Sequence, residues 1–120
     1  DGLIEIVRLI GSDVLPDEQK LIIEIAHIIR VGFLQQNAFH KEDTYVPLEK
    51  QKLMMHTIIY LYHKASALIS QAIPISDIIK TGLFEKLTSM KYDVENDALY
   101  KFDDYIKEID TKLSGFGREV

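Results

Sequence analysis

The stretch PLEKQKLMMHTIIYLYHKASALIS, residues 47–70, decides the fold. Its apolar side chains recur at the spacing of one helix face, at Met54, Ile58, Leu61, Ala65 and Leu68. Pro47 suits the first position of a helix, because the N–H that proline lacks has no intrahelical partner there. The stretch predicts a helix from Pro47 to Ser70 or Gln71, which at 1.5 Å per residue would be about 36 Å long. Such a helix outruns a small core, which leaves one end free to project.

A second helix is predicted upstream, from about Pro16 to Leu34 or Gln35. Its wide apolar stripe indicates burial on more than one side and consists of Leu21, Ile22, Ile25, Ile28, Ile29 and Phe33. Gly32 lies near the end of this helix, where glycine costs about 1 kcal/mol relative to alanine. This glycine either permits close packing or loosens the last turn.

The remaining predicted helices are shorter and cover residues 1–10, about 75–81, 83–90 and 96–113. Gly11, Gly82, Gly115 and Gly117 are natural stops after these segments. Residues 91–95 are expected to form a connection. The sequence contains no strand pattern and no internal repeat. It therefore predicts one all-α domain over residues 1–120, an irregular bundle of five or six helices.

The composition excludes several classes of protein. Hydrophobic residues make up 47% of the 120 residues, which argues against disorder. The net charge of −5 argues against a nucleic-acid partner, and the absence of cysteine excludes disulfides and thiolate chemistry. The longest apolar stretch, Leu21 to Leu34, is interrupted by Glu24, His27 and Arg30, so no direct membrane insertion is expected. The chain begins with Asp1, which suggests a piece of a larger protein.

The connection between the two long helices reads FLQQNAFHKEDTY, residues 33–45. It places the aromatic residues Phe33, Phe39 and Tyr45 where a plain loop would have small or polar ones. Aromatic side chains on a loop either pin it to the core or present a flat face to a ligand. Residue types alone favour pinning.

This connection, followed by Pro47-Leu48-Glu49-Lys50-Gln51, resembles the C-terminal part of the catalytic A subunit of V-type and archaeal A-type rotary ATPases. Residues 5–30, EIVRLIGSDVLPDEQKLIIEIAHIIR, resemble the segment just upstream in that family. The resemblance covers roughly residues 3 to 80, is most specific at LQQNAF, and thins beyond Lys80. Val46-Pro47 departs from it where a small or polar pair is expected, which changes how the next helix begins.

The resemblance implies a role in nucleotide binding. It places Phe39 against the adenine of ATP or ADP, with Asn37 and Ala38 lining the pocket and Gln36 as a weaker contact. An aromatic face suits this role, because stacking contributes about 1–3 kcal/mol per base in single-strand systems. The alternative from the residues alone remains that Phe39 pins the loop.

No phosphate-binding loop of the form G-x-x-x-x-G-K-[ST] occurs in these residues. The resemblance implies that an upstream domain holds the Mg-bound phosphates and supplies the catalytic residues. No catalytic residue is therefore predicted here, and the isolated chain is not expected to hydrolyse ATP.

The resemblance also implies that this domain faces the central rotor shaft. The predicted contact residues surround the end of the long helix and are Ser66, Ile69, Ser70, Ile73, Pro74, Ile75 and Ser76. Ile73 and Ile75 flank Pro74 in a turn where polar residues are usual, and exposed apolar residues mark interaction surfaces. The alternative is that both isoleucines tuck under the bundle.

The histidines and acidic residues give no comparable signal. His56 and His63 share a helix face but lie about 10 Å apart by helical rise, too far for one metal ion without other ligands. His27 suits a hydrogen-bonded core or edge position. The adjacent carboxylates of Asp103 and Asp104 point in different directions, so this region is expected to be a solvated face. No metal site is predicted.

The implied partners are non-catalytic B subunits in an alternating hexamer and the subunits of a central stalk. The implied location is the cytoplasmic side of the cell membrane, in a peripheral complex that couples ATP to proton or sodium translocation. Two rival hypotheses remain open. One is a stand-alone helical adaptor with Ile73-Pro74-Ile75 as its binding patch. The other is a small metal-dependent helical enzyme that uses His56, His63 and acidic residues.

Overall fold

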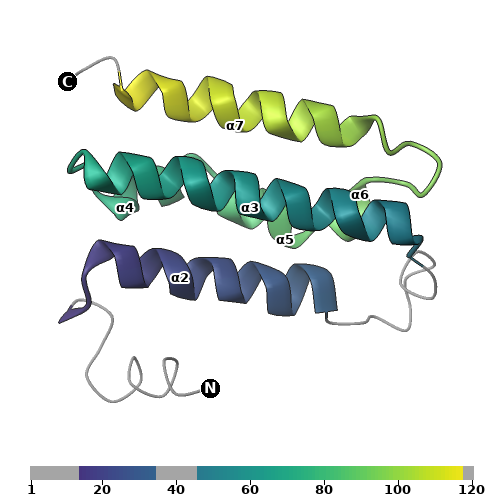
Figure 1. The fold of residues 1–120 in the computed structure, drawn as a ribbon, viewed down its shortest axis with the longest axis horizontal. Helices are drawn as coiled ribbons and strands as arrows, with labels where there is room; N and C mark the ends of the chain where they lie inside the picture. Colours follow the sequence, from purple (N-terminus) through teal and green to yellow (C-terminus); the bar gives the residue numbers. More distant parts are fainter. Residues whose placement is uncertain (1–13, 35–45, 118–120) are drawn as a thin grey trace.

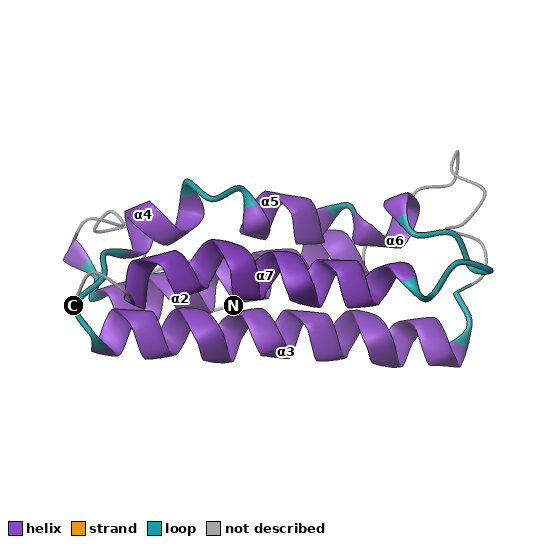
Figure 2. Ribbon diagram, turned by 90° about the horizontal axis from the view of Figure 1, so that it is seen from above, coloured by secondary structure: helices purple, strands orange, loops and turns teal. Residues whose placement is uncertain are grey.

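The computed structural model describes residues 14–34 and 46–117. Every regular element within these ranges is helical, which confirms the all-α prediction. Three long elements lie along the molecule (Figure 1): α2 (Asp17–His27) with its π-helical continuation η2 (Ile28–Leu34), α3 (Leu48–Ser70), and α7 (Lys101–Gly117). Three short helices, α4 (Ile75–Ile79), α5 (Leu83–Thr88) and α6 (Met90–Asp93), follow one another on the side opposite to α3 (Figure 2).

Helix α3 lies between α2 and α7, and its apolar stripe forms the centre of the core (Figure 1). The predicted stripe is confirmed, since all of its members are buried: Met54, Ile58, Leu61, Ala65 and Leu68. The expected projection of one end is wrong. The beginning of α2 accompanies the end of α3, where Glu18 accepts a hydrogen bond from Ser66 Oγ at 2.7 Å. The long helix is therefore covered along its length by other elements.

The last turn of α3 closes with a Schellman motif. The N–H of Ile73 donates to the carbonyl of Leu68 at 3.0 Å, and the N–H of Ala72 donates to the carbonyl of Ile69 at 3.0 Å. Ala72 has a positive φ of 68° and so occupies the left-handed region that glycine usually fills. Pro74 follows and precedes α4, so the motif turns the chain back under the bundle.

The π-helical segment η2 ends the second helix beside α5. A Cβ atom placed on Gly32 would lie 2.9 Å from the carbonyl oxygens of Leu87 and Thr88 and from the Cα atom of Thr88. Of the two roles considered for this glycine, close packing is therefore the one that the structure shows. The backbone of η2 touches the end of α5 with no room for a side chain.

Several boundaries in the second half of the chain differ from prediction. Residues 91–93, where a connection was expected, belong to α6, and α5 ends at Thr88 instead of residue 90. Helix α7 begins at Lys101 instead of residue 96 and ends at Gly117 instead of residue 113. Gly115 lies inside α7, and a Cβ atom placed on it would meet no atom within 4 Å, so its helical conformation meets no obstacle. Gly82, by contrast, has a φ of 82° and separates α4 from α5 as predicted.

Candidate functional site

The four residues predicted to face adenine, Gln36 to Phe39, lie outside the described residues. The structure does describe both ends of the connection that carries them. Its upstream end is η2, which rests on α5 through Gly32. Its downstream end is Val46 and the first turn of α3, where Gln51 Nε2 donates to the carbonyl of Val46 at 2.9 Å. The site is therefore defined by how these two ends are held.

Lys50 is the main contact at the downstream end. It lies in the first turn of α3, and its side chain has no exposed surface. Its Nζ donates to the carbonyl oxygen of Lys91 at 2.8 Å, to that of Val94 at 2.6 Å, and to Oδ1 of Asn96 at 2.9 Å. These carbonyls belong to the C-terminal end of α6, where backbone acceptors have no intrahelical donor. The ammonium group thus caps α6 and ties it to α3.

Lys50 is not among the predicted site residues, although the sequence contains a signal for it. Lys50 lies four residues before Met54 and so continues the apolar stripe of α3 by one turn. A lysine at a core position predicts either a side chain that reaches the surface or a buried one with several acceptors. The acceptors lie more than forty residues away in sequence, so the choice required the tertiary structure.

The predicted shaft contact lies at the opposite end of α3. Ser70, Pro74 and Ser76 are exposed, whereas Ser66, Ile69 and Ile73 are half-buried. The expected exposure of Ile75 is wrong, because its side chain is 4% exposed and belongs to the core. Its backbone N–H donates to Asp17 Oδ2 at 3.0 Å.

The half-burial of Ile73 has a local reason. A Schellman motif brings the residue after its left-handed position toward the helix that it ends, and Ile73 packs against the core cluster. The two isoleucines around Pro74 therefore serve the fold. The adaptor hypothesis loses the apolar patch on which it depended.

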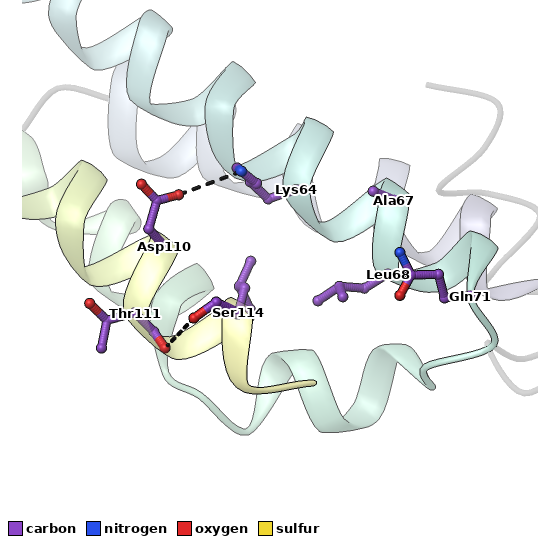
Figure 3. Close-up of a pocket in the computed structure, with 8 residues that line it drawn as sticks. Lys64, Ala67, Leu68, Gln71, Asp110, Thr111 and Ser114 are labelled. Carbon is purple, nitrogen blue, oxygen red and sulfur yellow. Dashed lines mark hydrogen bonds and ion pairs between the residues drawn. The ribbon is translucent and has the colours of Figure 1, made fainter. Parts of the chain in front are cut away.

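A pocket of about 490 Å³ opens beside this end, between the last turns of α3 and α7 (Figure 3). Lys64 of α3 and Asp110 of α7 point toward each other across it, with Nζ and Oδ1 3.6 Å apart. Asp110 also accepts a hydrogen bond from the Tyr60 hydroxyl at 2.6 Å, which raises the pKa of that phenol. The pocket is lined by Lys64, Ala67, Leu68, Gln71, Asp110, Thr111, Leu113 and Ser114. It offers a surface of mixed polarity next to the exposed Ser70.

The acidic face agrees with the solvated interpretation, whereas the core position considered for His27 is wrong because its side chain is exposed. His27, His56 and His63 are exposed, and so are Asp103 and Asp104. Within residues 14–34 and 46–117, no group of three or more His, Cys, Asp or Glu side chains is placed to hold a metal ion. In the same part of the chain, no helix has the length and apolar character needed to cross a membrane.

Comparison with known proteins identifies the family. Residues 1–79 match the family model of the C-terminal domain of V and A type ATP synthase. The chain is 48% identical over 116 residues to the V-type ATP synthase alpha chain 2 of Clostridium tetani, an alignment that covers 97% of this chain and 19% of the relative. It is 41% identical over 109 residues to the A subunit of the A-type ATP synthase of Methanopyrus kandleri, covering 91% of this chain and 18% of the relative.

A third relative, the V-type ATP synthase alpha chain of Halothermothrix orenii, is 48% identical over 110 residues, covering 92% of this chain and 19% of the relative. The chain thus spans less than a fifth of the length of these relatives. The family model ends at residue 79, close to Lys80, beyond which the sequence resemblance was expected to thin. The alignments with the relatives continue into the residues after Lys80. Because the family model covers most of the chain and full-length relatives of both types align with nearly all of it, the chain belongs to the family of C-terminal domains of V- and A-type ATP synthases.

Proposed function

We propose that this chain is the C-terminal domain of the catalytic subunit of a proton- or sodium-translocating rotary ATPase or ATP synthase. The observation that carries the proposal is its match to alpha chains and A subunits over nearly its whole length. In this role the domain performs no chemistry itself. It contributes one side of the nucleotide pocket and passes movement to the rotor.

Phe39 stacks on the adenine in this proposal, with Gln36, Asn37 and Ala38 beside it. The phosphates and Mg²⁺ of ATP or ADP are held by the upstream domain. The described residues support the proposal indirectly, because buried contacts through Gly32 and Lys50 hold both ends of the connection. A loop with fixed ends can present an aromatic face at a defined position, which stacking requires.

The surface that meets the central stalk is the exposed part of the turn between α3 and α4. It comprises Ser70, Pro74 and Ser76, with Ser66, Ile69 and Ile73 at its edge. Two carboxylates of α2 hold this end of the bundle together. Asp17 accepts a hydrogen bond from the N–H of Ile75, and Glu18 accepts one from Ser66 Oγ. Because hydrogen bonds fix this turn to α2, it can transmit a displacement of the domain to the central stalk.

The remaining partners of the complex follow from the same proposal. Non-catalytic B subunits alternate with the catalytic subunits in a hexamer. The complex is attached to the cytoplasmic side of the membrane as a peripheral assembly, and ion translocation takes place in other subunits.

The adenine role is tested by Phe39→Ala in the complete catalytic chain. Stacking is worth about 1–3 kcal/mol per base, so ATP affinity should fall by about 5- to 150-fold. Binding of inorganic tripolyphosphate should not change, because it has no base. Phe39→Tyr keeps the aromatic face and is the matched control, with affinity close to that of the unmodified protein. Unchanged ATP affinity in Phe39→Ala, with the helical circular dichroism retained, would remove Phe39 from the pocket.

A further inference from the structure

We propose that residues 87–94, the end of α5 with α6, form a platform that sets the position of the nucleotide-side connection, and that Lys50 is a positioning residue for it. The inference rests on the proposed function, because its readout is nucleotide binding. It assigns a role to the part of the chain beyond the family model, which ends at residue 79. It also gives a purpose to a buried lysine.

The two ends of the connection rest on consecutive parts of this platform. At the upstream end, the backbone at Gly32 lies against the backbone of Leu87 and Thr88. A Cβ atom added to Gly32 would lie only 2.9 Å from their backbone atoms. At the downstream end, Lys50 Nζ is bound to the carbonyls of Lys91 and Val94 at 2.8 and 2.6 Å. The short segment that both ends contact therefore adds a second constraint on the separation between η2 and α3, which also contact each other directly.

The contact through Lys50 specifies the orientation of α3 relative to α6 as well as the distance between them. The three acceptors that the described part of the chain offers equal in number the N–H donors of an ammonium group, and each hydrogen bond weakens when its angle departs from linearity. A buried apolar side chain of similar length would fill the same volume without fixing the orientation of α3 on α6. The ammonium group thus fixes the register in which the chain enters α3 after Val46.

The platform is itself held in place by the core and by α7. Met90 and Leu87 are fully buried, so the α5–α6 segment is embedded in the core. Lys86 of α5 forms an ion pair with Glu108 of α7. A displacement of α6 would therefore require movement of core residues. The platform can hold the two ends of the connection because it belongs to the rigid part of the domain.

The test uses Lys50→Met in the complete catalytic chain, since methionine keeps most of the volume and removes the donors. We expect ATP affinity to fall by about tenfold while tripolyphosphate affinity stays unchanged. Amide hydrogen exchange should accelerate selectively in residues 46–53. Gly32→Ala should produce the same loss of ATP affinity from the other end, because its Cβ meets backbone atoms that cannot move aside.

Ile109→Ala is the matched control, because Ile109 is fully buried in α7 and is not one of the residues by which the proposal holds the connection. It should lower stability without a selective change in residues 46–53 or a selective loss of ATP affinity. If Lys50→Met fails to fold, Asn96→Ala removes a single acceptor and should give a smaller effect in the same direction.

The outcomes separate this inference from the proposed function. Unchanged hydrogen exchange in residues 46–53 would overturn the anchoring. Accelerated exchange with unchanged ATP affinity would overturn the positioning role, provided that Phe39→Ala weakens ATP binding. If Phe39→Ala has no effect, the adenine role fails, and the exchange measurement alone decides whether the platform holds the connection.

Discussion

Lys86 lies between a carboxylate and an aromatic ring, and both contacts join α5 to α7. Its Nζ is paired with Glu108 and lies 4.7 Å from the centroid of the Tyr105 ring. Burial is the main cause that raises the pKa of Tyr105 to about 12, so the phenol stays neutral at physiological pH and offers the lysine an aromatic face. Hydrogen bonds from Lys86, and next from Lys112, lower the pKa of Glu108. A few side chains thus make the electrostatic link between two helices.

We expect Glu108→Gln to lower the free energy of unfolding at pH 7 by less than about 1 kcal/mol, because both partners are partly exposed to water. The pKa of Glu108 is lowered in the folded state, so its contribution is complete above the unfolded value of about 4.3. The contribution is lost as the pH falls through the lower folded value. The difference between the two proteins should therefore be complete at pH 7 and smaller at about pH 3.

Urea unfolding at both pH values checks this expectation. Asp103→Asn is the matched control, because Asp103 is an exposed carboxylate on the same helix. An equal difference between Glu108→Gln and the unmodified protein at both pH values would show that the charge of Glu108 is not the cause.

At the scale of the element, α3 shows that a glycine is not needed to end a helix. Ala72 adopts the left-handed conformation of the Schellman motif, whereas Gly115 continues α7 as an ordinary helical residue. The reason is that Pro74 and the burial of Ile75 oblige the chain to turn after α3. Tertiary contacts override the local preference of these residues.

We expect Ala72→Gly to raise the free energy of unfolding by about 0.5–1 kcal/mol. The left-handed conformation costs a residue with a Cβ about 1–2 kcal/mol. The added freedom of glycine in the unfolded chain offsets about 0.4–1 kcal/mol of the gain. Chemical denaturation measures the result. Ala67→Gly, at an exposed position inside the same helix, should instead lower stability by about 1 kcal/mol. A similar loss of stability in both variants would contradict the expectation.

At the scale of the whole molecule, α3 separates the two proposed functional ends. The end of η2, the start of α3 and α6 lie at one end of the bundle, while the α3–α4 turn and the start of α2 lie at the other (Figure 1). A helix of 23 residues spans about 35 Å at 1.5 Å per residue. With its stripe buried along this length, α3 can carry a displacement as a rigid element from the proposed nucleotide side to the proposed shaft side.

We expect the double substitution Ser70→Glu with Ser76→Glu, in the assembled complex, to weaken binding of the central stalk by at least about tenfold. Both serines are exposed, so the charges alter the surface without disturbing the core. ATP affinity should stay unchanged, because the proposed nucleotide side lies at the far end of α3. Lys52→Glu, an exposed position near that far end, should leave stalk binding unchanged. Unaltered stalk affinity in the double variant would place the contact elsewhere.

Much of this arrangement could be predicted from the residues themselves. The 3.6-residue spacing of apolar side chains and Pro47 predicted α3 to within one residue at each end, because burial of one face and the fixed φ of proline act locally. The second long helix was predicted equally well, apart from its π-helical end. The motif LQQNAF, with the residues around it, indicated the family. The four residues of the adenine side, Gln36 to Phe39, stay a prediction.

The tertiary structure decided the features that depend on distant partners. The burial of Lys50 depends on carbonyls that lie 41 and 44 residues away, and no local pattern specifies where those groups will be. The same applies to Ile75, which becomes a core residue once Asp17 holds its N–H, and to the late start of α7 after the segment that Lys50 caps. Sequence by itself determined the helices and the family, because periodicity and motifs are local properties. Only the folded chain decided which polar groups are buried, because burying a charge is favourable only where its acceptors have been brought together.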